Sequence, residues 1–179
     1  MKGIVFTEFL EMVEKEFGYE TIDQILEDNE LASGGAYTSV GTYNHAEMID
    51  LLGSLSAISK QEVSALLHAF GRYIFDAFLK GYPQFFEKCA HGFEFLESID
   101  GHIHVEVKKL YPDAMLPRFE TTINGTEMAM NYYSDRRFSD FASGLIERTM
   151  EYYGHGFSMQ KELMNQEGSE VKFTIKVAE

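Results

Sequence analysis

The sequence predicts an α+β protein, in which a helical N-terminal lobe packs on a C-terminal lobe with helices and a roughly four-stranded antiparallel sheet. Apolar residues recur at helical spacing over most of residues 3–112, and the period changes to that of strands from residue 119 onward. The length of 179 residues corresponds to one domain. We expect a single domain, 1–179, with a helical lobe at about 1–65 and a second lobe at about 66–179.

The N-terminal helices are expected from their apolar faces. The first helix ends at Gly18, and its apolar residues are Val5, Phe9, Met12, Val13 and Phe17. Further helical segments are expected over residues 21–29, 45–58, from Ser59 to about Lys80, and over 84–99, with a loop at 30–44. Ser59 and Glu62 match a capping box, in which each side chain accepts a hydrogen bond from a free backbone N–H.

The C-terminal elements follow from turn and alternation signals. Asn124-Gly125 between two strand-like runs predicts a hairpin. Residues 137–153 return to helical spacing, and the tail alternates as a strand with Val171, Phe173, Ile175 and Val177 on one face. The segment from Asp100 to Leu110 fits either a strand or a helix.

Charge and cysteine content exclude several classes of protein. The net charge is −14 with a pI near 4.8, so the surface repels phosphate backbones and anionic membranes, and we expect neither as a partner. No run of 18 apolar residues occurs, and Glu8 and Glu11 interrupt the N-terminal apolar run, so we expect a cytoplasmic protein. One cysteine, Cys89, excludes an intrachain disulfide framework and a cysteine-ligated iron–sulfur cluster.

Tyr132, Ser134 and Arg136 form the first candidate site. In a strand, alternate residues lie on one face, so this spacing predicts a phenol, a hydroxyl and a guanidinium side by side. All three can donate hydrogen bonds to an anion, and Arg can bind a carboxylate through two bonds. The alternative is a polar strand edge that faces water.

Histidines are the second candidate. A strand would place His102, His104 and Glu106 on one face, as a metal site would require, whereas a helix would not. No His pair has the spacing of a zinc protease, and the proximity of Cys89 to His91 does not identify a catalytic pair. No nucleophile elbow, P-loop or dinucleotide-binding motif occurs, so we do not expect an enzyme.

Several of these residues, in order, resemble the haem nitric oxide/oxygen-binding (H-NOX) family, stand-alone bacterial type. Tyr132-x-Ser134-x-Arg136 resembles its propionate-binding signature, and the Met-Lys-Gly start is similar to that of its members. His104 lies 14 residues before Arg118, and Pro117-Arg118 resembles the Pro-containing turn of the family. Gly144-Leu145-Ile146 matches the helix after the signature, so the resemblance covers essentially the whole chain.

The resemblance implies a non-covalent haem b between the two lobes. His104 would be the proximal ligand on a helix, Pro117 would press on the porphyrin, and Tyr132, Ser134 and Arg136 would bind the propionates. The family positions that line the distal pocket correspond to Val5, Phe9, Phe78, Phe141 and Leu145. No C-x-x-C-H motif occurs, so covalent attachment is excluded independently.

The resemblance also implies a function. Oxygen-binding members use a tyrosine where this chain has Phe141, which cannot donate a hydrogen bond, so we expect NO and CO to bind and O2 to be excluded. Tyr73 or Tyr82 would defeat this inference by entering the pocket. NO would release His104, shift the lobes and regulate a separate chain, either a sensor histidine kinase or a diguanylate cyclase or phosphodiesterase for cyclic-di-GMP.

Other functions remain open at this point. They are a haem-free protein–protein adaptor, an O2- or redox-responsive haem protein, and a non-haem metal enzyme that uses His102, His104 and Glu106. A single-thiol response at Cys89 is the only redox role that the cysteine content allows.

Overall fold

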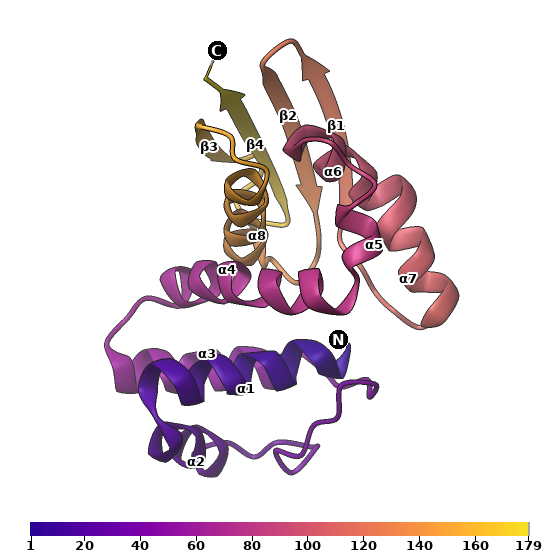
Figure 1. Cartoon of the computed structure of the whole chain (residues 1–179). Coiled ribbons are helices and arrows are strands. Elements are labelled where there is room, and N and C mark those ends of the chain that lie inside the picture. Colours follow the sequence, from indigo (N-terminus) through magenta and orange to yellow (C-terminus); the bar gives the residue numbers. More distant parts are fainter. Residues whose placement is uncertain (179) are drawn as a thin grey trace.

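A computed structural model describes residues 1–178, and its chain forms a helical lobe and a lobe built on a sheet (Figure 1). The helices are α1 (Gly3–Phe17), α2 (Tyr19–Glu27), α3 (His45–Ser59), α4 (Val63–Gly81), α5 (Pro83–Phe86), α6 (Gly92–Ser98), the π-helix η1 (Ile99–Ile103), α7 (His104–Leu110) and α8 (Ser139–Tyr152). The strands are β1 (Arg118–Asn124), β2 (Glu127–Tyr133), β3 (Phe157–Leu163) and β4 (Glu170–Val177). Within residues 1–178, no helix is long and apolar enough to cross a membrane.

The helical lobe has its own apolar core between α1, α2, α3 and one face of α4. Its fully buried residues include Phe6, Phe9, Ile25, Met48, Leu51, Leu55, Phe70 and Ile74. The expected first helix is confirmed, and it ends because Gly18 adopts a φ of 90°, which glycine tolerates. The expected boundary between residues 65 and 66 falls inside α4, whose buried residues contact both lobes.

The expected capping box is wrong. Ser59 is the last residue of α3, and Lys60 then takes the left-handed conformation with a φ of 60°. The N-cap of α4 is Glu62, whose side chain makes no capping hydrogen bond. The helix therefore begins three residues later than the Ser59 signal indicated.

The described residues form an antiparallel sheet of four strands in the order β1-β2-β4-β3, as expected. Asn124 pairs with Glu127 at the end of the β1–β2 hairpin, which confirms the turn predicted at Asn124-Gly125. One face of the sheet packs on α6 and α8 through buried residues, namely Met128, Met130, Tyr132, Val171, Phe173 and Ile175. The expected helical connection is α8, which joins β2 to β3.

Helices α4 and α8 join the two lobes by a very close backbone crossing. A Cβ atom added to Gly144 would lie 2.1 Å from the carbonyl oxygen of His68, and one added to Gly71 would lie 2.1 Å from that of Phe141. Only glycine permits this approach. The crossing fixes the position of Phe141 on α8 relative to α4.

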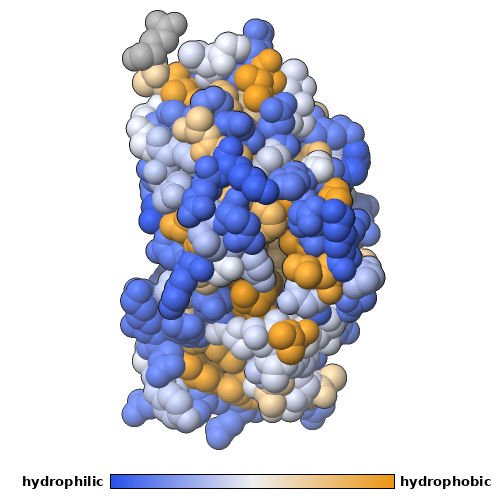
Figure 2. Space-filling model, turned by 45° about the vertical axis from the view of Figure 1, so that its right-hand side comes forward, coloured by the Kyte–Doolittle hydropathy of each residue, from blue (hydrophilic) through white to orange (hydrophobic). Residues whose placement is uncertain are grey.

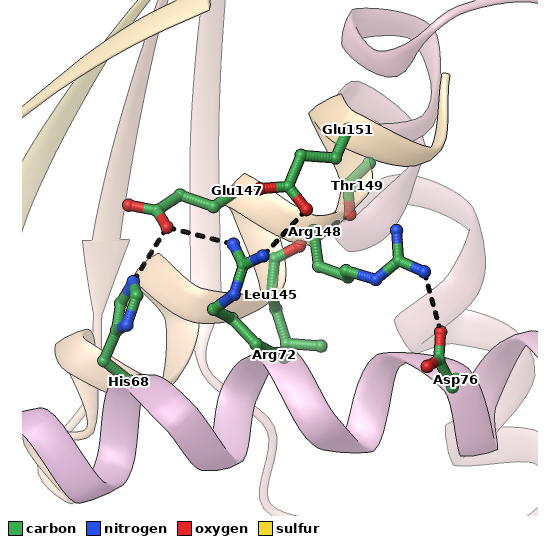
Figure 3. Close-up of polar contacts among 8 residues, drawn as sticks. All are labelled: His68, Arg72, Asp76, Leu145, Glu147, Arg148, Thr149 and Glu151. Carbon is green, nitrogen blue, oxygen red and sulfur yellow. Dashed lines mark hydrogen bonds and ion pairs between the residues drawn. The ribbon is translucent and has the colours of Figure 1, made fainter. Parts of the chain in front are cut away.

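Charged side chains flank this crossing, as Figure 3 shows. Glu147 accepts from His68 at 2.9 Å and from Arg72 at 3.2 Å, while Arg72 also donates to Glu151 at 2.8 Å. A separate pair joins Arg148 to Asp76 at 3.1 Å. These bonds are partly exposed, so each contributes modestly, but together they hold α8 along α4.

Candidate functional site

Two adjoining apolar cavities lie between the lobes. The first, of about 270 Å³, is lined by residues of the helical lobe, α4, α6, α8 and the sheet. The second, of about 310 Å³, is lined by the N-terminal segment, α4, α5 and α7. They share the residues Val5, Phe78, Phe86, Phe95, Ile103, His104 and Leu116. Figure 2 shows apolar residues at a recess between the two parts of a mostly hydrophilic surface.

His104 lines both cavities, and a π-helical turn places it there. The segment expected to be strand or helix is helical, and the His104 backbone N–H donates to Ile99 O, five residues back. The wider turn of η1 precedes His104 directly, and π turns of this kind are frequent at functional sites. The imidazole side chain is 17% exposed.

One nitrogen of the His104 imidazole, Nδ1, has no hydrogen-bond partner among residues 1–178. It is enclosed, and Asp100 Oδ1 is 3.7 Å away, beyond hydrogen-bond distance. Burial lowers the pKa of His104, while the charge of Asp100 and the Pro117 carbonyl act in the opposite direction. The ring is therefore neutral at pH 7, the form in which imidazole binds a metal.

The helix separates His104 from the other members of the alternative metal site. The ring of His102 packs edge-on against Phe85, and Glu106 pairs with Lys109 at 2.6 Å. Within residues 1–178, no three His, Cys, Asp or Glu side chains come together as metal ligands. The non-haem metal enzyme at His102, His104 and Glu106 therefore loses its geometric basis.

The end of β2 brings together Tyr132, Ser134 and Arg136. The prediction that strand alternation aligns them is wrong, because Ser134 and Arg136 lie beyond the strand. Strand β2 ends at Tyr133, and the chain then turns, with the Arg137 N–H bonded to Ser134 O and a φ of 60° at Arg137. The Ser134 hydroxyl accepts from the Arg136 N–H at 3.2 Å, which shapes the turn.

These side chains do not form a polar edge facing water. Tyr132 is 2% exposed and lines the first cavity, where its hydroxyl accepts from the Phe138 N–H at 3.0 Å. Burial raises the pKa of Tyr132, so its hydroxyl keeps a proton to donate. Ser134 is half-buried and does not line either cavity among the described residues.

Arg136 lines the first cavity without a carboxylate partner. In a chain with 29 acidic residues, its guanidinium makes no ion pair with any residue in 1–178. Burial lowers the pKa of Arg136, although the group stays charged. A half-buried cation beside an apolar cavity calls for a ligand with an acidic group.

The remaining expected site residues divide into two groups. Pro117, Val5, Phe78, Phe141 and Leu145 line the first cavity, whereas Phe9 is buried behind Phe70, with ring centroids 5.3 Å apart. Of the two tyrosines that could defeat the O2 argument, Tyr73 lines a separate groove on α1 and α4, and Tyr82 lines the second cavity.

Polar residues that the sequence did not reveal close the outer edge of the second cavity. Lys2 Nζ donates to Thr42 Oγ1 at 2.8 Å and lies 4.3 Å above the Tyr111 ring. Thr42 Oγ1 donates to Asp113 Oδ2 at 2.9 Å. These contacts join the helical lobe to the segment after α7 at the cavity edge, which Lys2 and Tyr111 line.

The donor set fits haem. A flat apolar macrocycle needs apolar walls, its iron needs a neutral imidazole, and its two carboxylates need hydrogen-bond donors and a cation. The two cavities supply the walls, and His104, Tyr132 and Arg136 supply the polar groups. The buried imidazole of His104, which lines both cavities, and the unpaired Arg136 are the observations that this ligand would explain.

Comparisons with known proteins agree with that fit. The H-NOX protein from K. algicida, in the Fe(II) unliganded state, is 40% identical with a TM-score of 0.96, covering 100% of this chain and 97% of that one. The Shewanella woodyi H-NOX, in the Fe(II)CO state with IWP-051 bound, is 40% identical with a TM-score of 0.84, covering 99% and 95%. No curated protein sequence matches the chain.

An H-NOX protein from S. oneidensis in the Fe(II)NO state shares the fold, with a TM-score of 0.91 over all of both chains at 22% identity. The family model described as Haem-NO-binding matches residues 2–161. The chain therefore belongs to the Haem-NO-binding, or H-NOX, family and binds haem.

Proposed function

We propose that the chain is a haem-based NO sensor in which His104 binds the iron and Tyr132, Ser134 and Arg136 bind the propionates. One observation carries the proposal: within residues 1–178, a buried imidazole and a guanidinium without an ion pair line the same apolar cavity. Bound haem would supply a ferrous iron with one side open to a diatomic gas. Family membership excludes the haem-free adaptor.

The cavity walls support selectivity for NO and CO over O2. Val5, Phe78, Phe141 and Leu145 present only carbon atoms to the first cavity, and Phe9 packs behind this wall. Bound O2 acquires negative charge and needs a hydrogen-bond donor, which these side chains do not supply. Tyr82 lines the second cavity and is not part of the wall that Phe141 and Leu145 form in the first. We therefore propose that O2 is excluded.

Signal transmission would begin at His104. It is the first residue of α7, and the segment after α7 contacts the helical lobe through Asp113 and Thr42. Release of the imidazole would free α7 and relieve the contact of Pro117 with the porphyrin, so the two lobes would shift. Gas binding drives this change only to the extent that the two shapes differ in NO affinity.

The shifted surface would regulate another protein. We propose that this partner is a sensor histidine kinase or an enzyme of cyclic-di-GMP metabolism, and that the two proteins meet in the cytoplasm. We propose no catalytic activity for this chain. The charge of −14 favours a partner with a basic docking surface. Redox signalling through Cys89 is disfavoured, because burial raises the pKa of its thiol and a protonated thiol reacts slowly.

The test is the absorption spectrum of the reduced protein with and without NO. The expected spectrum is that of five-coordinate ferrous haem, which NO converts to a form without the histidine bond. His104→Gly should lose the iron–protein bond and regain it with added imidazole, while His102→Gly, the matched control two residues away, should behave as wild type. If His102→Gly loses the bond and His104→Gly keeps it, the ligand assignment is wrong.

A further inference from the structure

We infer that Asp100 is a positioning residue for His104 and sets the strength of its bond to iron. The inference rests on the proposed function, because it assumes that His104 is the iron ligand. Asp100 Oδ1 lies 3.7 Å from Nδ1 of His104, the enclosed nitrogen that has no other partner among residues 1–178. Asp100 itself lines neither of the two cavities.

The carboxylate of Asp100 is held in place by the sheet. Its Oδ1 atom accepts a hydrogen bond of 2.9 Å from the backbone N–H of Phe119, the second residue of β1. The ring of Phe119 in turn lies 5.9 Å from the His104 ring, centroid to centroid. Strand β1 therefore holds the carboxylate of Asp100 in place beside the ring of His104, which lies on the same helical run.

The π-helical turn brings the two residues into line. Asp100 and His104 are four residues apart, and residues at this spacing lie on the same helical face. The wider turn of η1 brings this pair closer to one line along the helix than a regular α-helical turn would. A movement of about 0.5 Å would bring Asp100 Oδ1 within hydrogen-bond distance of Nδ1.

The chemical effect follows from the two nitrogens of imidazole. A carboxylate at Nδ1 favours the tautomer that carries the proton there, which leaves the lone pair of Nε2 for a ligand in the cavity. By accepting the Nδ1 proton, a carboxylate also raises the basicity of Nε2 and strengthens its bond to a metal. Asp100 would therefore determine how readily NO releases His104.

Asp100→Asn is the informative variant, because the amide oxygen can still accept from the Phe119 N–H while the negative charge is lost. The control is Glu97→Gln, which removes one exposed charge from the same helical run, on α6. The iron–histidine stretching frequency of the ferrous protein is measured by resonance Raman spectroscopy. Asp100→Asn should lower it, and Glu97→Gln should not.

A second measurement is the rate at which the histidine bond is lost after NO is added. We expect this rate to rise about tenfold in Asp100→Asn, the low end of effects seen when a partner of a metal ligand is removed. Asp100→Glu retains the charge and should stay closer to wild type in both measurements. This variant also keeps the test decisive if Asp100→Asn fails to fold.

The outcomes separate the two proposals. The proposed function stands if wild type shows the iron–histidine band and His104→Gly loses it. If, in addition, Asp100→Asn matches Glu97→Gln in frequency and rate, the role of Asp100 is overturned. If His104→Gly retains the band, the proposed function is wrong and the inference is lost with it. A lower frequency and faster loss in Asp100→Asn alone support the role.

Discussion

Replacing Gly144 by Ala should destabilise the protein and test the close crossing of α4 and α8. The new Cβ atom would lie 2.1 Å from the backbone oxygen of His68, 2.9 Å from the backbone nitrogen of Arg72 and 3.1 Å from the Cα of Gly71. All three are backbone atoms, so no side chain can rotate away and the helices must separate. Overpacking of this kind costs up to about 3 kcal/mol.

The net effect is smaller, because Ala is the better helix former. Exchange of Gly for Ala inside a helix contributes about 1 kcal/mol to stability, so the free energy of unfolding should fall by roughly 2 kcal/mol. For a protein of this size, that lowers Tm by roughly 4–8 °C.

The assay is thermal unfolding followed by circular dichroism at equal haem loading. Gly53→Ala is the matched control, because Gly53 also lies inside a helix but a Cβ there meets no atom within 4 Å. That variant should gain stability and raise Tm by roughly 2–4 °C. If Gly144→Ala melts at or above the wild-type temperature, the backbones of α4 and α8 are not in this close contact.

Three further predictions follow from the site and its surroundings. Arg136→Ala should lose haem to excess apomyoglobin at least roughly tenfold faster than wild type, because a propionate loses a charged partner, whereas exposed Arg137→Ala should not. Phe141→Tyr should create a hydrogen-bond donor and give a stable O2 complex in air-equilibrated ferrous protein; an unchanged spectrum would contradict the selectivity argument. Burial, aided by Glu47, raises the pKa of Tyr37 from 10.0 to about 12, so stability to urea should fall as pH rises from 10 to about 12, and Tyr37→Phe should make that slope shallower.

Much of the architecture could be predicted because its patterns are local. The β1–β2 hairpin needs a turn at Asn124-Gly125, and the alternation in the tail has the period of a strand, so both were predictable without knowledge of their neighbours. The capping-box prediction fails because Ser59 ends one helix and does not begin the next. Lys60, in the left-handed conformation, gives no signal in its residue type.

The site was less accessible to sequence reasoning. Ser134 and Arg136 are two residues apart, but a turn and not a strand brings them near Tyr132, and the positive φ at Arg137 could not be read from its side chain. Without the family resemblance, the pattern would not have distinguished a buried anion site from a polar edge. The roles of these residues toward haem remain predictions.

The role of Asp100 depends on the π-helical turn, and one pattern in the sequence could have predicted this turn. Phe95, Ile99, Ile103 and Val107 are spaced uniformly by four and all contact the cavities. In a regular helix of 3.6 residues per turn, such a series drifts by about 40° per step and would leave the cavity. A wider turn corrects the drift, so uniform spacing by four across one apolar face could have indicated it.

The contacts of Lys2, Thr42 and Asp113 mark the edge at which we expect haem to enter. On one side of the cavities the lobes are held by glycine-mediated backbone contact, and on the other by the exposed Thr42–Asp113 hydrogen bond and the contact of Lys2 with the Tyr111 ring. Each such contact contributes about 1 kcal/mol or less, so separating that edge demands far less free energy than unfolding either core. Haem uptake by already folded apoprotein should therefore be rapid, and should proceed through this edge without denaturant or chaperone.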